Sequence, residues 1–463
     1  MKFVALGDTS GIGASCHFLD IAGTGLALDA GSDPRREGSD SMPRFHIIHD
    51  HPDWYVDHTL VTHAHHDHMG GLPVLIQEFP HVMAHMTEAT RKLLDFLLPA
   101  SARLQKRKLK AGETNVQPLF TEEDVEHQSH FYLTHKLDTP FDITGVAGET
   151  PVTAVFHPAG HILGSVGVEL RFEEEGQPRR IFYSGDTNAQ GQSIIPGGTY
   201  PDAADTLILE TTLGNDPEME RTTRQQEVEK FKEMLERVIR RGGTALVPVF
   251  VMGRAQETLA LIHRFKQQGV IPADVPVYTA GSMRAIADVY DKTREKTPRH
   301  DPAFKVFGVE QHRLPYNDQQ QARSLEGPSI HVMSSGMMFE PTLSNMIARR
   351  LVEGEKNGIL LVGYAVEDTP ARRLTEAVEE GRHAVLLNKN TGPQPLNCEV
   401  GKFRLSGHSN RQDLLRLVEH LSPQQVVLVH GEPDARDWMA EHIARAHPDI
   451  DVHLPEWGAP IEL

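Results

Sequence analysis

Residues 61–68 constrain this chain more than any other segment, because they read Val-Thr-His-Ala-His-His-Asp-His. An apolar strand precedes them and a glycine pair follows. In an extended segment residues two apart point to one side, so His63 and His65 share a face. Asp67 and His68 follow where the chain turns toward a helix, and they aim at a second point nearby. This geometry suits two metal ions a few ångströms apart, as in phosphoryl-transfer sites. A surface run or a tag is the alternative, but a tag would be terminal and would lack the strand and the glycines.

The composition is that of a large globular protein. The chain has 463 residues, 39% of them hydrophobic, and a net charge of −18. No apolar run approaches the ~18 residues that span a membrane, and the N-terminus lacks a secretory signal. Only Cys16 and Cys398 are cysteines, which excludes a disulfide framework and a cysteine-rich zinc module, so we expect a cytoplasmic protein. The acidic balance argues against a surface coated for nonspecific polyanion binding but allows a local basic cleft.

The pattern of expected elements divides the chain into three parts. Residues 1–214 mix short strands with a few helices, and residues 401–463 return to that architecture. Residues 215–400 alternate strands with helices, which is typical of a parallel α/β unit. A long charged helix, Glu218–Arg241, opens the middle part and ends at a glycine pair. Further elements are expected as strands at Phe3–Leu6, Cys16–Ile21, Gly25–Leu28, His58–Thr62, Thr244–Phe250, Val275–Thr279, Ser329–Met333, Gly358–Val362 and Val426–Val429, and as helices at Thr87–Leu98 and Ala255–Gln268.

Three more residues stand where metal sites are often built. Asp29 ends a strand in Leu-Asp-Ala-Gly, His161 lies in the glycine-flanked loop Ala-Gly-His-Ile-Leu-Gly-Ser, and Asp186 follows a strand in Tyr-Ser-Gly-Asp-Thr. Each signal is weak alone, because an aspartate at a strand end is more often a turn former. Together with residues 61–68, their order and contexts resemble the metallo-β-lactamase fold, whose motifs run Asp, HxHxDH, His and Asp.

This resemblance implies a set of zinc ligands. It implies that one zinc ion is held by His63, His65 and His161, that a second is held by Asp67 and His68, and that Asp186 bridges both. Asp29 would orient the histidine loop from behind the ligands.

Downstream segments narrow the resemblance. Leu209–Gly214 reads Leu-Glu-Thr-Thr-Leu-Gly, Phe403–His408 reads Phe-Arg-Leu-Ser-Gly-His, and Leu428–Glu432 reads Leu-Val-His-Gly-Glu. With Gly253-Arg254-Ala255-Gln256-Glu257, Ser335-Gly336-Met337-Met338 and Val362-Gly363-Tyr364, they resemble the β-CASP family of nucleic-acid-processing nucleases nearly end to end. The resemblance implies an α/β protein: a metallo-β-lactamase αββα sandwich with an inserted β-CASP α/β domain. The layout is similar to minimal bacterial or archaeal relatives of the endonuclease subunit that cleaves pre-mRNA 3′ ends.

The family's motifs assign roles to further residues. Glu210 matches the motif A acid and His408 the motif B histidine, so His408 would protonate the leaving oxygen while Glu210 orients it. His430 matches motif C, where histidine is associated with RNA rather than DNA, and would complete the second zinc shell. Asp67 counts with Glu210 and His408 as a catalytic residue. The plain alternatives are a capping or packing role for His408 and a buried structural role for His430.

The expected function is that of a ribonuclease with two Zn²⁺ per chain. It would hydrolyse single-stranded RNA to 5′-phosphate and 3′-hydroxyl ends, mainly endonucleolytically, with 5′→3′ exonuclease activity as a second mode. Two alternatives stay open: hydrolysis of DNA or a small phosphodiester, and a non-catalytic RNA-binding partner subunit. The oligomeric state is open as well, with a homodimer as one candidate, and no membrane association is expected.

Substrate contacts and departures from the family pattern are less sharply defined. Ser406, Arg254 and Ser335 are candidates for phosphate contacts, although Arg254 equally suits a tight strand-to-helix turn. The basic run Arg103–Lys110 is interpreted as a solvated helix face in preference to an RNA grip. The segments that depart from the family pattern are Asn410 in place of aspartate, Phe339-Glu340-Pro341, Ala280-Gly281-Ser282-Met283 and Gly11-Ile12-Gly13.

Overall fold

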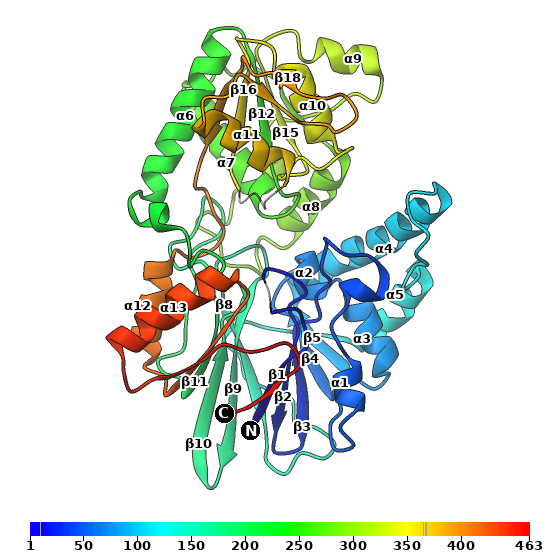
Figure 1. Ribbon diagram of the computed structural model, residues 1–463, viewed down its shortest axis with the longest axis vertical. Helices are drawn as coiled ribbons and strands as arrows, with labels where there is room; N and C mark the ends of the chain where they lie inside the picture. The colour runs from blue at the N-terminus through cyan, green and yellow to red at the C-terminus, as the bar shows by residue number, and fades with distance from the viewer. Residues whose placement is uncertain (10, 364, 366–367) are drawn as a thin grey trace.

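The computed structural model describes residues 1–9, 11–363, 365 and 368–463. Two seven-stranded sheets make a sandwich in one half of the molecule, and a six-stranded sheet organises the other half (Figure 1). Tyr364, which belongs to one of the family segments, lies outside the described residues.

The first sheet of the sandwich is built from N-terminal strands and closed by the last strand of the chain. In order across the sheet its strands are β22 (Pro460–Glu462), β1 (Lys2–Ala5), β2 (His17–Ile21), β3 (Thr24–Leu28), β4 (His58–Leu60), β5 (Met83–Thr87) and β6 (Tyr132–His135). The strands expected at Phe3–Leu6, Cys16–Ile21, Gly25–Leu28 and His58–Thr62 are confirmed to within two residues.

The second sheet joins the middle of the sandwich sequence to the C-terminal part. Its strands are β21 (Asp451–His453), β20 (Gln425–Val429), β11 (Thr206–Glu210), β10 (Gln177–Tyr183), β9 (Val166–Glu174), β8 (Thr153–Pro158) and β7 (Phe141–Asp142). Leu19 and Leu26 of the first sheet are buried in one apolar core with Phe156 and Val168 of the second. This shared core holds the two sheets face to face.

Helices cover both outer faces, which makes the sandwich an αββα fold (Figure 1). On the first sheet lie α1 (His46–His49), α3 (Leu72–Glu78), α4 (Glu88–Lys110) and α5 (Glu122–Gln128), and on the second lie α12 (Arg411–Leu421) and α13 (Pro433–Ala446). A single turn, α2 (His66–Met69), follows β4. In the part of the chain described, no helix has the length and apolar character needed to cross a bilayer.

The third sheet is parallel throughout. Its order is β14 (His312–Arg313), β13 (Val277–Thr279), β15 (Ser329–Met333), β12 (Thr244–Pro248), β16 (Gly358–Leu361) and β19 (Glu399–Lys402). Parallel neighbours need crossover connections. Helices of this half are α6 (Arg224–Arg240), α7 (Arg254–Gln267), α8 (Gly281–Lys292), α9 (Asp318–Arg323), α10 (Leu343–Leu351) and α11 (Pro370–Glu379), and a short hairpin pairs β17 (Ala384–Val385) with β18 (Gln394–Pro395).

Helix α6 starts later than the expected Glu218. The hydroxyl of Thr223 accepts from the Gln226 N–H at 3.2 Å, and the Gln226 side chain accepts from the Thr223 N–H at 2.8 Å. This capping box fixes the first turn at Arg224. The preceding residues Pro217–Glu220 form a separate 3-10 turn.

The basic run belongs to α4, which continues to Lys110 instead of ending near Leu98. Its cations face surface acids: Lys108 pairs with Glu37 at 3.0 Å, and Arg103 pairs with Glu122. These exposed pairs favour the interpretation of a solvated helix face.

Candidate metal centre

Loops at one end of the sandwich bring the candidate residues together, on the side that faces the third sheet. Asp29 follows β3, His63 to His68 follow β4, His161 follows β8, Asp186 follows β10, Glu210 ends β11, and His430 follows β20. These strands come from both sheets, so the site lies across the seam of the sandwich.

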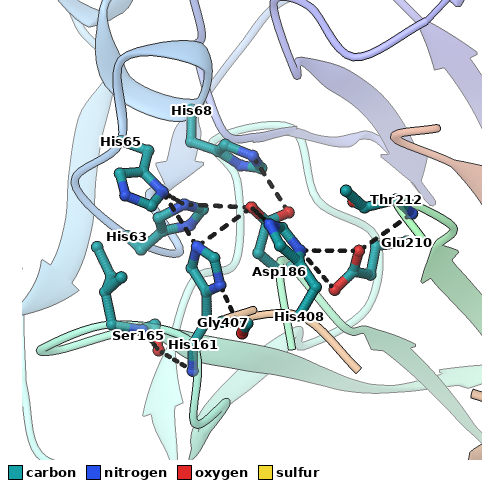
Figure 2. A network of polar contacts seen from close by, with 12 residues as sticks. His63, His65, His68, His161, Ser165, Asp186, Glu210, Thr212, Gly407 and His408 are labelled. Atoms are coloured by element: carbon teal, nitrogen blue, oxygen red, sulfur yellow. Dashed lines mark hydrogen bonds and ion pairs between the residues drawn. The ribbon is translucent and has the colours of Figure 1, made fainter. Parts of the chain in front are cut away.

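A first group of donors consists of three histidines. The Nδ1 atom of His65 lies 3.1 Å from His63 Nε2 and 3.0 Å from His161 Nε2 (Figure 2). His63 and His161 are buried. Burial lowers the pKa of His65 to about 4 and holds the pKa values of His63 and His161 well below their usual value. Neutral imidazoles with converging nitrogens are the form that binds metal.

A second group lies beside the first. His68 Nε2 is 3.2 Å from His430 Nε2, which in turn is 3.4 Å from Asp67 Oδ2. His430 has a left-handed backbone with φ of +51°, a strained conformation for a residue other than glycine. Its Nδ1 lies 3.0 Å from the Thr212 hydroxyl, which fixes the ring. Together these contacts aim Nε2 at the site.

The carboxylate of Asp186 lies between the two groups. Its Oδ2 is 3.5 Å from both His63 Nε2 and His161 Nε2, and its Oδ1 is 3.3 Å from His68 Nε2. Burial opposes ionisation, but the imidazoles of His430 and His68 outweigh it and hold the pKa of Asp186 well below its usual value. Oδ1 is buried and accepts no hydrogen bond from any described residue.

The donor set fits zinc. Imidazole nitrogens and carboxylate oxygens are ordinary zinc ligands, and the buried Oδ1 of Asp186 has no hydrogen bond from a described residue that a metal ion would have to displace. His63, His65, His161 and Asp186 gather their donor atoms within 4.8 Å of one another, as do Asp67, His68 and His430. Glu210 also lies this close to Asp186 and His430.

Asp29 lies behind both groups and is fully buried. Its carboxylate accepts from the Thr62 N–H at 2.7 Å, from His68 Nδ1 at 2.8 Å and from the Tyr183 hydroxyl at 2.8 Å. The Thr62 hydroxyl then reaches His63 Nδ1 at 3.0 Å. One aspartate therefore orients a histidine of each group.

Glu210 and His408 form a pair next to Asp186. His408 Nδ1 lies 3.1 Å from each oxygen of the Glu210 carboxylate (Figure 2). The same carboxylate also accepts the Thr187 N–H at 2.8 Å. His408 Nε2 points inward, 4.0 Å from Asp186 Oδ2. Burial disfavours the imidazolium, but the carboxylates of Glu210 and Asp186 outweigh burial and raise the pKa of His408 to about 9.

The three residues expected to contact phosphate differ in position. Ser406 lines a small cavity of about 30 Å³ together with His408. Arg254 is buried below the same segment, and one of its terminal nitrogens, Nη2, has no acceptor among the described residues. Ser335 has its contacts within the other half of the molecule, where its carbonyl accepts from the Ser344 hydroxyl at 2.7 Å.

Two departures from the family pattern have a local explanation. The Asn410 side chain accepts from the Asp413 N–H at 2.9 Å and so caps α12, which is a helix-capping role and not a contact to His408. At Gly11 a Cβ atom would lie 3.0 Å from Glu432 Oε2, so the Glu432 carboxylate fills the space beside the loop.

Sequence reasoning missed the residues that support the candidate metal ligands from behind. Thr62, Tyr183 and Thr212 hold Asp29 or His430, and each stands within a quoted motif. Arg224 was missed as well. It lies at the start of a charged helix, and its contact to the Ser406 carbonyl spans 182 residues, so no local signal marks it.

Comparison with protein families matches three consecutive regions of the chain. Residues 26–249 match the beta-lactamase superfamily domain, residues 255–374 the Beta-Casp domain, and residues 393–455 the Zn-dependent metallo-hydrolase RNA specificity domain.

Curated relatives align with nearly all of this chain. Cleavage and polyadenylation specificity factor 73 of Drosophila melanogaster is 27% identical over 100% of this chain, and Endoribonuclease YSH1 of Saccharomyces cerevisiae is 26% identical over 93%. The chain spans 65% and 54% of the lengths of these relatives, less than two thirds.

A solved structure has the same fold at low sequence identity. It is a protein of unknown function from Enterococcus faecalis V583, with a TM-score of 0.56 and 14% identity, and the alignment covers 100% of this chain and 99% of that one. With three family regions in order over a sandwich and its α/β insert, the chain belongs to the β-CASP family of the metallo-β-lactamase superfamily.

Proposed function

We propose that the chain is a zinc-dependent ribonuclease that hydrolyses single-stranded RNA to 5′-phosphate and 3′-hydroxyl ends. The observation that carries this proposal is the shared carboxylate: Asp186 faces one group of donors with each oxygen, and the Glu210–His408 pair lies beside it. His63, His65 and His161 would hold one zinc ion, Asp67, His68 and His430 the other, and Asp186 both. We also propose that the insert begins after residue 214 and ends at residue 400.

Zinc bound in such a site supplies a hydroxide nucleophile at neutral pH and neutralises charge on the phosphoryl oxygens. Asp29 sets the angles of His63 and His68 from behind. Asp186 and Asp29 outweigh burial and raise the pKa of His68 well above its usual value, so zinc binding there would release a proton.

The leaving ribose 3′-oxygen needs a proton, and His408 is placed to give it. Glu210 accepts from Nδ1, so the inward Nε2 carries the transferable proton. A pKa of about 9 keeps that proton on the ring at neutral pH. Glu210 therefore acts by orienting and charging His408.

Substrate phosphates would contact Ser406, Arg254 and Ser335. The cavity beside His408 and the unused Arg254 Nη2 support the first two. Arg254 supplies a buried cation on a chain whose net charge is −18. The proposed phosphate contact of Ser335 rests on the sequence motif alone.

RNA is favoured over DNA and over small phosphodiesters. Histidine at position 430, the match to an RNA specificity domain and the names of the relatives support RNA. The insert built on the third sheet speaks against a small substrate. Cleavage within the RNA, with 5′→3′ exonuclease activity as a second mode, a cytoplasmic location and a homodimer complete the proposal.

The test uses one single-stranded RNA labelled at either end, with and without a zinc chelator. We expect internal fragments that disappear with chelator and return with zinc. His408→Ala should lose about 10²–10⁴-fold in cleavage rate while it retains bound zinc. Full activity of the zinc-loaded variant would overturn the role of His408. No cleavage of RNA by the zinc-loaded wild type would overturn the proposal, and cleavage of DNA in its place would support the first alternative.

A further inference from the structure

Three consecutive residues that lead to His408 are each held by a charged side chain from the other half of the molecule. Glu227 accepts from the Arg404 N–H at 2.8 Å, Arg254 Nη1 donates to the Leu405 carbonyl, and Arg224 Nη1 donates to the Ser406 carbonyl at 3.2 Å. Arg224 and Glu227 lie on α6, and Arg254 starts α7. Side chains from helices of the insert thus form hydrogen bonds to the backbone that leads from β19 back to the sandwich.

That backbone is tied directly to the site. The His408 N–H donates to the Ser406 hydroxyl at 3.0 Å, and His161 Nδ1 lies 2.9 Å from the Gly407 carbonyl. A Cβ atom at Gly407 would lie 3.0 Å from Arg254 Nη2 and 3.2 Å from His161 Nδ1. The Arg254 guanidinium and His161 therefore pack closely on either side of Gly407, and a side chain at this position would push one of them aside.

Holding this loop with Arg254 carries the desolvation penalty of a buried charge. Its side chain is only 7% exposed, and Glu257, a buried acid that acts on it electrostatically, uses its oxygens on the backbone N–H groups of Ile194 and Ile195. An apolar side chain of similar volume would fill the same space without the desolvation penalty of a buried charge. What the guanidinium adds is directional hydrogen bonding to one carbonyl.

We infer that Arg224 and Arg254 are positioning residues that hold the Leu405–His408 segment so that His408 can protonate the leaving oxygen. The inference rests on the proposed function. It makes correct seating of the inserted domain a condition for the proton transfer, because both arginines belong to the insert and His408 belongs to the sandwich.

The test compares two phosphodiesters with different leaving groups. RNA loses a ribose 3′-oxygen that needs a proton, whereas bis(4-nitrophenyl) phosphate loses a stabilised phenolate that does not. R224A should lower kcat on RNA by about 10–100-fold with little change in KM. R254A should lower kcat by as much and should also raise KM, because its Nη2 is a proposed phosphate contact. Both variants should change kcat on the nitrophenyl ester by less than about threefold. His408→Ala should show the same selective loss, and R254A/H408A should be no slower on RNA than His408→Ala alone, because both substitutions disable one step.

Arg264, an exposed arginine near the end of α7, provides the control: R264A should leave both rates unchanged. Zinc content and the unfolding midpoint are measured for each variant. If R254A does not fold, R254K keeps the charge but loses the planar fork, and the same selective loss is expected of it.

Equal losses on both substrates would overturn the inference, and so would a raised KM with kcat unchanged, which would make Arg254 a phosphate-binding residue only. Independent, multiplicative losses in the double variant would also overturn it. A wild type that cleaves RNA while the arginine variants cleave it equally well refutes this inference alone. A zinc-loaded wild type that hydrolyses only the nitrophenyl ester refutes the ribonuclease proposal, and the inference with it.

Discussion

Asp29 shows how much one buried side chain can do for a site that it does not enter. Its backbone is left-handed, with φ of +62°, so the local chain is held in a conformation that aspartate tolerates better than most residues. From there one carboxylate accepts from Thr62, His68 and Tyr183. The orientation of His63 and His68, two of the proposed zinc ligands, therefore depends on Asp29, which precedes Thr62 by 33 positions.

Asp29→Asn should weaken zinc binding more than it weakens the fold. The amide would replace one of the two accepting oxygens with an NH2 donor, so the side chain could no longer accept from both Thr62 and His68. We expect zinc affinity to fall by about 10–100-fold, as is usual for partners that orient metal ligands. Competition with a chromophoric chelator measures it.

Asp57→Asn is the matched control for that experiment. Asp57 is also buried. Its carboxylate accepts hydrogen bonds from the backbone N–H groups of Gly25 and Val146 and not from a proposed zinc ligand. It should lower the unfolding midpoint and leave zinc affinity unchanged. If the two variants lose zinc affinity equally, Asp29 has no special role at the centre.

At the scale of strands, three histidines connect β4, β5 and β6 inside the sandwich. His58 Nδ1 lies 2.9 Å from His85 Nε2, and His85 Nδ1 lies 2.9 Å from His135 Nε2. Phe141 packs on His85 and His135 with nearly parallel rings. His85 is only 2% exposed, and burial, with the neighbouring His58 and His135, lowers its pKa to about 3.

These three hydrogen-bonded histidines should make the free energy of unfolding depend on pH in mild acid. In the unfolded chain His85 titrates near 6.5, so the unfolded state binds a proton first as the pH falls. Stability is therefore complete above about pH 6.5 and is lost progressively toward the folded pKa near 3, by about 2 kcal/mol at pH 5 from His85 alone. Urea unfolding of the zinc-free protein at pH 7.5 and pH 5 measures the loss.

His85→Phe should lower stability at pH 7.5, because His58 and His135 lose a partner, and should reduce the further loss between pH 7.5 and pH 5 by about 2 kcal/mol. His127→Phe, at an exposed position on α5, should leave the pH dependence as in the wild type. An unchanged acid slope in His85→Phe would show that His85 is not the group that titrates.

Much of the fold and the candidate site was predictable because the informative residues follow strands. His63, His161, Asp186 and His430 each stand within three residues of the end of a strand, and these strand ends lie together at one end of the sandwich. The predicted start of α6 was wrong because a run of charged residues does not distinguish a 3-10 turn from an α-helix.

Contacts across the sheet and between the halves were beyond sequence reasoning. His85 and His135 are single histidines 50 residues apart, aligned only by the pairing of β5 with β6. Arg224 meets Ser406 only because the insert folds back on the sandwich. Such pairs carry no spacing that a pattern could detect.

For the whole molecule, the space between its halves differs from place to place. A cavity of about 360 Å³ lies between the start of α4, the loop around His161 and Lys296–Pro298, whereas the cavity beside His408 is small. The cavity beside His408 has a volume of about 30 Å³, which is too small for a nucleotide. On the proposed function, an internal RNA segment would therefore reach His408 after the halves move apart at this point. At one edge they are joined by an exposed ion pair, in which Lys296, after α8, lies 2.8 Å from Glu88 at the start of α4.

Lys296→Ala should accelerate entry of RNA. An exposed pair contributes about 0–1 kcal/mol to the closed arrangement, so its loss should raise kcat/KM for RNA by up to about fivefold if opening limits the reaction. Glu88→Ala should act alike, and the double variant should gain no more than either single one, because all three remove the same contact. Lys92→Ala is the control: Lys92 pairs with Glu88 at 3.0 Å within α4, so this variant loses the same charge and no contact between the halves. An equal gain in Lys92→Ala would assign the effect to charge, and no gain in Lys296→Ala would mean that this contact does not hold the entrance.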